Sequence, residues 1–369
     1  MKRKQLIAGS IVLVALVALL FWARHHIHFD FGVLREQVAN ADWRKILIAI
    51  GCIYAGYIIR SVRWALLLRH HKQVPLLSLI GTQVIGFTAV ALIGRVADLV
   101  RPYLVSRRTG LELSSQVAVY IVERLFDAGA MALIFSVAIL QVPESQVTAA
   151  VQHSKHLAAL SQSAPWVAVA IFRYGGLVLT LLGALFLLGI RVAGESLARL
   201  FESAFGLISK NLGRSIGHKI RTFHSGLDTM RSFSDFAATA SLSIGMWVLI
   251  AAAYTLTMHA FTASPELANL NVGKCVLLMV LSGSASALQL PIIGWFTQIG
   301  VVAAAITGFF GASPEASTAC AATLLLVTFL GIIPVGLIWA QVEGVRFKNL
   351  TRASEEASEQ IADEARALD

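Results

Sequence analysis

The chain has 369 residues, of which 57% are hydrophobic and only 14% are charged. A soluble protein has about 25% charged residues, so this composition excludes a soluble globular protein and leaves no basic soluble domain for nucleic acid. The net charge is +9, but the last fifteen residues carry six acids and one arginine, so residues 1–354 carry +14. Such a basic surface suits the anionic headgroups of a membrane.

Several apolar runs reach the ~20 residues that a helix needs to cross the hydrocarbon core of a bilayer. The first run follows Met1-Lys-Arg-Lys and is not followed by a small-residue cleavage site, so we interpret it as a retained helix. We expect an all-α polytopic membrane protein with about six spans, at residues 5–22, 46–67, 117–140, 166–190, 241–262 and 317–341.

Two further apolar regions, residues 76–94 and 274–311, are rich in Gly, Ser, Thr and Pro. Lys and Arg accumulate on the cytoplasmic side of membrane proteins. Basic residues occur on both sides of residues 76–94, which predicts a re-entrant helical hairpin that enters and leaves by the cytoplasmic face. Residues 274–311 can form a second hairpin from the opposite face, although three ordinary crossings between residues 274 and 341 satisfy the same charges.

The domain organisation follows from this charge pattern. We expect a transmembrane domain at residues 1–345 that includes a basic cytoplasmic loop at 191–240, and a polar acidic tail at 346–369. Both termini are predicted to be cytoplasmic. Broken segments at corresponding places in two halves of a chain are typical of a transporter site. The two hairpins would then form an inverted repeat and meet near the membrane midplane, although no internal sequence repeat is visible.

One predicted span carries an unusual set of polar residues. Tyr120, Glu123, Arg124 and Asp127 have the spacing i, i+3, i+4, i+7, which places them on one face of a helix. A carboxylate costs roughly 2.5–3.5 kcal/mol at the centre of a membrane helix. A salt bridge that fixes helix packing is one interpretation. We favour a polar cavity that needs charge, because buried ion pairs add little net stability.

A second charged motif follows the first predicted hairpin. Arg95, Asp98 and Arg101 stand three residues apart and would form one stripe on a helix. The planar guanidinium of arginine matches phosphate oxygens in a bidentate way. Cytoplasmic flanking charge is the alternative interpretation, and it accounts well for Arg107 and Arg108.

Other polar residues also lie at or inside apolar segments. Arg60 and Arg63 are near the inner end of the second predicted span, where they would either snorkel to the membrane surface or contact a headgroup. The second hairpin region contains helix breakers and amides that could form a buried polar environment, or only a packing kink: Gln289, Pro291, Gly294 and Gln298.

Motifs for nucleotide hydrolysis, for a serine nucleophile and for a zinc protease are absent from the sequence. We therefore expect no catalytic residue, no metal site and no cofactor, and a protein that is not an enzyme. Cys52, Cys275 and Cys320 are widely separated, which fits neither a zinc site nor a disulfide framework. They are interpreted as small buried hydrophobic residues.

Residues 94–110 and 122–127 together resemble the transmembrane region of the lysylphosphatidylglycerol synthase/flippase family. The family pattern runs roughly Gly-Arg-x-Gly-Glu-x-x-Arg, then Arg-Arg-Thr-Gly, then Glu-Arg-x-x-Asp. Asp98 stands here where the family usually has Glu. Gln298 stands where the family tends to have the Glu of a Pro-x-x-Gly-x-x-Glu motif. The resemblance covers residues 1–345 and does not extend to an aminoacyl-transferase domain, so lysine transfer is not implied.

The resemblance implies a lipid transporter of the bacterial cytoplasmic membrane. Its cargo would be an anionic, polyprenyl-phosphate-type or hopanoid-type lipid. The implied partners are membrane lipids with a phosphate-bearing headgroup. A lipid-modifying enzyme and a second copy of the chain are also compatible with the resemblance. The alternative is a non-transporting partner or regulator of an envelope-lipid biosynthetic enzyme. The headgroup would be held by Arg95, Arg101 and Arg124, and these would be oriented by Asp98, Glu123 and Asp127.

Overall fold

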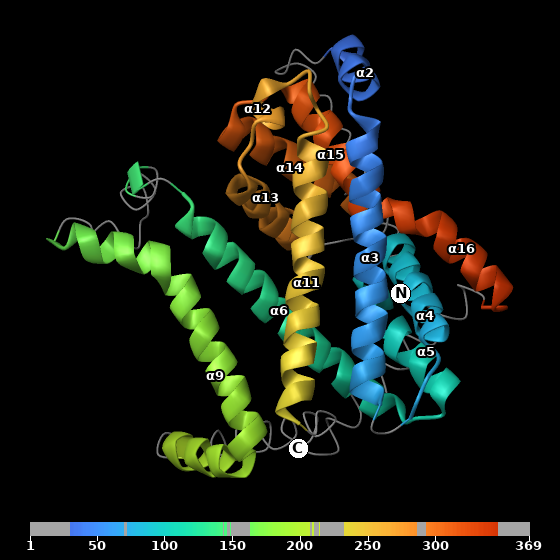
Figure 1. Cartoon of the computed structure of the whole chain (residues 1–369), viewed down its shortest axis with the longest axis vertical. Coiled ribbons are helices and arrows are strands. Elements are labelled where there is room, and N and C mark those ends of the chain that lie inside the picture. The colour runs from blue at the N-terminus through green and yellow to red at the C-terminus, as the bar shows by residue number, and fades with distance from the viewer. Residues whose placement is uncertain are drawn as a thin grey trace, which may run out of the picture.

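The computed structural model describes five stretches of the chain (Figure 1). These are residues 30–69, 72–142, 163–206, 232–285 and 293–345, with isolated residues at 144, 145, 148, 209 and 214. Every regular element within them is a helix, which confirms the predicted all-α architecture. The predicted span at 5–22 and the acidic tail at 346–369 lie outside the described residues.

Three predicted spans correspond to single helices: α3 (Trp43–Leu68), α6 (Leu113–Leu140) and α11 (Phe233–Met258). The predicted span 166–190 lies in α9 (Pro165–Gly206), which is bent by 44° between Pro165–Ile171 and Arg173–Phe186 and has a kink at Ala193. By length and composition, three of the described helices can cross a membrane: α3, α11 and α4 (Leu76–Ile93). This number rises to five if two bent pairs, one within α9 and one at the C-terminal end, each count as one span. α6 has the length of a span but carries three charged residues in its apolar run.

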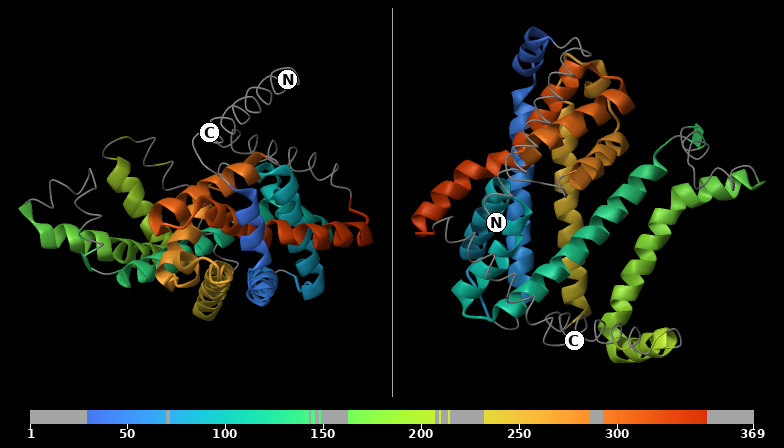
Figure 2. Two further views of the ribbon diagram at one scale, coloured as in Figure 1. Left: turned by 90° about the horizontal axis from the view of Figure 1, so that it is seen from above. Right: turned by 180° about the vertical axis from the view of Figure 1, so that it is seen from behind.

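The long helices α3 and α11 lie side by side and form the centre of the structure (Figures 1 and 2). Each begins with a side-chain cap, from Asp42 for α3 and from Ser232 for α11, which satisfies backbone N–H groups at the helix start. Ion pairing between Arg69 and Asp235 joins the two helices at one end. At the other end, Lys45 Nζ donates to the carbonyl of His259 at 2.9 Å.

The hairpin predicted within residues 76–94 is wrong in its bounds, and the first hairpin of the structure is instead formed by residues 76–109. Residues 76–93 form one unbroken helix, α4, and the chain then turns back through η1 (Arg95–Leu99) and α5 (Val100–Thr109). Gly94 makes the turn with φ 88°, a conformation that favours glycine. The prediction placed the whole hairpin within residues 76–94 because it counted Arg101 among the arginines of a cytoplasmic loop that follows residue 94. In the structure Arg101 is buried.

The second hairpin, α13 (Val272–Ala285) and α14 (Ile293–Phe310), occupies the opposite end of the bundle (Figure 1). Both are shorter apolar helices, which fits a hairpin better than two ordinary crossings. Two short helices, α2 (Phe31–Ala39) and α12 (Pro265–Ala268), lie at the same end. Buried side chains of α11, α13, α14 and α15 (Pro314–Thr328) form a shared apolar core that includes Cys275 and Cys320.

The last predicted span, residues 317–341, is broken in the structure. It consists of α15 (Pro314–Thr328), η3 (Leu330–Ile332) and α16 (Ile333–Val342), with a bend of 40°. Pro334 begins the new helix after the bend, where its missing N–H is tolerated. The bend carries α16 across to the first hairpin, where it packs against α4.

The contact between α4 and α16 depends on a glycine. A Cβ atom added at Gly336 would lie 1.8 Å from Oγ1 and 2.6 Å from Cβ of Thr88. Because Thr88 is β-branched and stiff at χ1, it cannot turn aside without moving the backbone.

Gly336→Ala should therefore destabilise the protein, since overpacking costs about 1–3 kcal/mol. The measurement is the fraction of monodisperse protein that survives heating, followed by size-exclusion chromatography in detergent. Gly129→Ala on α6 is the matched control: no atom lies within 4 Å of its added Cβ, so it should keep or raise stability. Equal losses in both variants would contradict this account of the packing.

Candidate functional site

Four arginines and two carboxylates meet where α3, α5 and α6 come together. We call this group the arginine cluster. Glu123 and Asp127 are on α6, and both are at most 3% exposed. Their i, i+4 spacing places both carboxylates on the α6 face that meets α3, as the sequence predicted. The arginines come from three helices: Arg60 and Arg63 from α3, Arg101 from α5 and Arg124 from α6.

Arg63 makes the shortest contacts in the cluster. Its Nη2 lies 2.5 Å from Glu123 Oε1, and its Nη1 lies 2.6 Å from Asp127 Oδ1. Nη1 also donates to Ser243 Oγ on α11 at 2.5 Å. One side chain thus links α3 to both α6 and α11, and its guanidinium engages both carboxylates, the arrangement in which charge-assisted hydrogen bonds are strongest.

Arg60 and Arg124 complete the shell around Asp127. Arg60 Nη1 lies 3.1 Å from Asp127 Oδ2 and 3.4 Å from Glu123 Oε1. Arg124 Nη2 lies 3.1 Å from Asp127 Oδ2. Arg60 and Arg63 therefore point inward to carboxylates. Snorkelling to the membrane surface was the wrong expectation for them, because the acids of α6 provide a closer partner than water.

Arg101 is completely buried and is held mainly by aromatic rings. Its guanidinium carbon lies 4.5 Å from the centre of the Phe87 ring and 5.0 Å from that of Tyr120. Its Nη1 makes only long contacts, of 3.4 Å to Gln83 Oε1 and 3.5 Å to Glu123 Oε2. Its Nε and Nη2 have no hydrogen-bond partner among the described residues. Cation–π attraction is therefore a major part of what holds this charge.

The helix packing makes room for Arg101 at one glycine. A Cβ atom at Gly86 of α4 would lie 2.2 Å from Cγ of Arg101. The arginine side chain thus passes directly over the α4 backbone, and any larger residue would displace it.

The cluster has more positive than negative charge. Glu123 and Asp127 can neutralise only two of its four arginines, and Asp98 in η1 adds one further acid nearby. The face of α6 taken alone has an acidic surplus, because it carries Glu123 and Asp127 but only one arginine, Arg124. That surplus is reversed by arginines from α3 and α5, which lie far away in the chain.

A cavity of about 210 Å³ adjoins the cluster. Arg60, Arg124 and Asp98 form its charged wall. Arg124 is the most accessible of these cations, with 34% of its side chain exposed. Ser282 of α13 and Gln298 of α14 form part of the opposite wall, so the cavity lies between the two hairpins.

The wall contributed by the second hairpin is neutral. Tyr254 Oη donates to Ser282 Oγ at 2.9 Å, and Gln298 Nε2 donates to the same oxygen at 3.1 Å. Gln298 Oε1 is buried without a hydrogen-bond partner in the described part of the chain. A neutral acceptor therefore stands at the position where the family pattern has a carboxylate.

Most of the site residues expected from the sequence gather here. Gly294 is buried at the start of α14. Arg95 belongs to η1, but its side chain is outside the described part, as are Gln289 and Pro291. The residues that the structure brings to the cluster or its cavity are Arg60, Arg63, Asp98, Arg101, Tyr120, Glu123, Arg124, Asp127 and Gln298.

Three participants were missed from the sequence. Gln83 is the one amide side chain in the apolar helix α4, and that was a usable signal, whereas Ser243 is one of several hydroxyl residues in α11 and gives none. Phe87 carries no such signal, since an aromatic residue in an apolar helix is ordinary. Within the described residues, no group of three or more His, Cys, Asp or Glu side chains could hold a metal ion.

A protein-family comparison matches residues 6–336 to the "Lysylphosphatidylglycerol synthase TM region". The chain belongs to this family. It is a multi-pass membrane protein of a flippase-type family. No curated protein and no solved structure matches it. In this lysylphosphatidylglycerol synthase transmembrane-region protein, the charged motifs of α5 and α6 meet in one buried cluster.

Asp127→Asn should destabilise the protein strongly, because it leaves the four arginines of the cluster facing a single carboxylate, Glu123. Breaking a buried ion pair typically costs about 3–5 kcal/mol. Thermal survival in detergent measures the effect. Glu195→Gln removes the exposed partner of Arg199 on α9 and should change stability by less than about 1 kcal/mol. Equal thermal survival of Asp127→Asn and wild type would show that the cluster does not stabilise the fold.

Proposed function

We propose that this protein moves a lipid with an anionic, phosphate-bearing headgroup across the bacterial cytoplasmic membrane. The observation that carries this proposal is the buried surplus of arginine beside the cavity between the two hairpins. An anionic phospholipid and a polyprenyl-phosphate-type lipid both suit this charge. A hopanoid-type lipid without a phosphate would gain no binding energy from this positive charge.

The proposed binding step uses the cavity arginines. Phosphate oxygens would bind Arg124 and Arg60, whose guanidinium groups can each donate two parallel hydrogen bonds. Glu123 and Asp127 would keep these arginines in place when no lipid is bound, because they already contact both. The positive surplus would offset the desolvation of the phosphate group, which is costly in an apolar environment.

The proposed translocation step follows from the arrangement of the hairpins. The cavity has one wall from the α4–α5 hairpin and another from the α13–α14 hairpin, which enter from opposite ends of the bundle. Rocking of one broken element against another around a fixed site is how many transporters expose a site alternately to the two sides. The predicted cytoplasmic position of both termini would make the α4–α5 hairpin face the cytoplasm.

The competing function is a partner or regulator of an envelope-lipid enzyme that transports nothing. Its arginine cluster would then hold a structural lipid. Both functions predict lipid binding, so only movement between leaflets separates them.

Arg124→Gln should slow the movement of fluorescent phosphatidylglycerol in proteoliposomes by about tenfold or more, since it removes charge-assisted bonds to phosphate. Arg124→Lys should be intermediate, because it retains the charge but not the planar guanidinium. The matched control is Arg44→Gln, an exposed arginine on α3 away from the cavity, which should resemble wild type.

All variants need to be compared at equal reconstitution and with monodisperse protein. Failure of folded wild-type protein to move any anionic or polyprenyl-phosphate lipid would exclude transport and support the non-transporting partner.

Gln298→Glu should change headgroup preference. A glutamate carboxylate cannot donate to Ser282 Oγ as the Gln298 amide does, so the Ser282 hydroxyl has to donate to it instead. The new charge at the cavity wall repels phosphate. We expect phosphatidylglycerol to be slowed more than phosphatidylethanolamine, whose ammonium group can approach the new carboxylate. Gln298→Ala, which removes the amide without adding charge, should slow both lipids to a similar extent. An unchanged ratio between the two lipids in Gln298→Glu would mean that Gln298 does not face the headgroup.

A further inference from the structure

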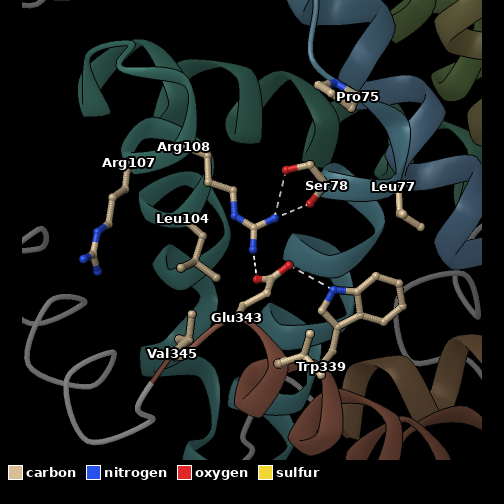
Figure 3. A pocket seen from close by; sticks show the side chains of 11 residues that line it. Pro75, Leu77, Ser78, Leu104, Arg107, Arg108, Trp339, Glu343 and Val345 are labelled. Atoms are coloured by element: carbon tan, nitrogen blue, oxygen red, sulfur yellow. Dashed lines mark hydrogen bonds and ion pairs between the residues drawn. The ribbon is translucent and has the colours of Figure 1, made fainter.

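A second and larger cavity, of about 900 Å³, opens at the base of the α4–α5 hairpin (Figure 3). It lies between the start of α4, the end of α5 and the end of α16. None of its lining residues lines the cavity beside the arginine cluster. We call it the hairpin-base cavity. The transport step proposed above does not use it.

One of its two arginines is already engaged. Arg108 donates to the carbonyl of Ser78 and, at 3.1 Å, to Ser78 Oγ, and it pairs with Glu343 of the α16 end. Trp339 Nε1 donates to Glu343 Oε1 at 2.9 Å. Figure 3 shows this network, which joins the hairpin to α16. The Arg108 and Glu343 side chains each keep 22% of their surface exposed, so a ligand can reach both.

The second arginine is available. Arg107 is exposed, and no ion pair of its side chain occurs among the described residues. In Figure 3 its guanidinium points away from the network of Arg108. The cavity therefore has two arginines and one carboxylate, which leaves one positive charge that an anion can neutralise.

The remaining lining is apolar and partly exposed. Leu77 is 67% exposed and Val342 is 80% exposed, and Leu104, Val345 and Pro75 complete this surface. A free phosphate ion would use only the arginines. A phosphate attached to a glycerol and acyl chains would use the arginines and the apolar lining together. Trp339 adds an aromatic ring of the kind that is enriched at membrane interfaces.

We propose that the hairpin-base cavity binds the phosphate group of an anionic membrane lipid. The exposed Arg107 side chain turns toward Arg108, and the two arginines hold the phosphate. The glycerol and first acyl carbons lie against Leu77 and Val342. The phosphate competes with Glu343 for Arg108. The proposal for this site requires only lipid binding, so it does not depend on transport through the other cavity.

The test is photolabelling of the full-length protein in nanodiscs with a phosphatidylglycerol that carries a diazirine on its acyl chain. Labelled peptides are then mapped by mass spectrometry. We expect labelling within residues 75–78 or 339–345. Arg107→Gln with Arg108→Gln should lower this labelling about tenfold, because two charge-assisted contacts to phosphate are lost. Arg44→Gln and the cavity variant Arg124→Gln should leave it unchanged.

Glu343→Gln provides the opposite change. The amide still accepts from Trp339, but it no longer competes for Arg108 as an anion, so labelling should rise several-fold. A rise confined to these peptides, with labelling elsewhere in the chain unchanged, does not come from misfolding, which would raise labelling generally. This keeps the proposal testable even if the arginine variants fold poorly. No increase in a well-folded Glu343→Gln protein would overturn the proposed competition.

Two comparison probes identify the ligand chemistry. Diacylglycerol with the same diazirine chains should label these peptides far less, because it has no phosphate. Equal labelling would overturn the phosphate site and indicate an apolar contact only. Inorganic phosphate at millimolar concentration should compete weakly. Complete competition at that concentration would assign the site to soluble phosphate and overturn its assignment to a lipid.

Discussion

Two carboxylates on one face of a membrane helix have to be neutralised by partners from the protein, because no water is available in the hydrocarbon core to solvate them. Glu123 and Asp127 impose this constraint, and Arg63 meets it by binding both within 2.6 Å. Since Arg63 also donates to Ser243, the same contact positions α3, α6 and α11 relative to one another. The α4–α5 hairpin, which carries Arg101, packs against α3 and α6.

The arginines outnumber the acids, and this excess is difficult to explain by stability alone. A helix bundle that needed only to neutralise two carboxylates would use two cations, because each further buried charge adds a desolvation cost. Arg101 illustrates the cost, because two of its nitrogens have no hydrogen-bond partner among the described residues and two aromatic rings are its main contacts. A site that receives an anion accounts for such an excess, and the adjoining cavity with Arg124 on its wall provides the space.

The two hairpins explain why a small cavity lies in the interior of the bundle. Each enters from its own end, so their inner ends meet where the continuous helices α3 and α11 pass by. The first hairpin supplies charge, through Asp98 and Arg101, and the second supplies neutral hydrogen-bonding groups, through Ser282 and Gln298. A headgroup between them would meet cations on one side and a neutral amide on the other.

The sequence by itself determined the membrane class, the positions of several long helices and most of the residues that meet in the arginine cluster. Long apolar runs, and charges placed where charge is costly, follow from the physics of the bilayer and are readable locally. Only the tertiary structure decided the partners of those charges. That Arg60 and Arg63 bind the acids of α6, that Arg101 returns into the bundle after Gly94, and that the last span bends toward α4 all depend on packing between segments distant in the chain. A local pattern shows that a buried charge needs a partner, but the partner is set by which helices pack together.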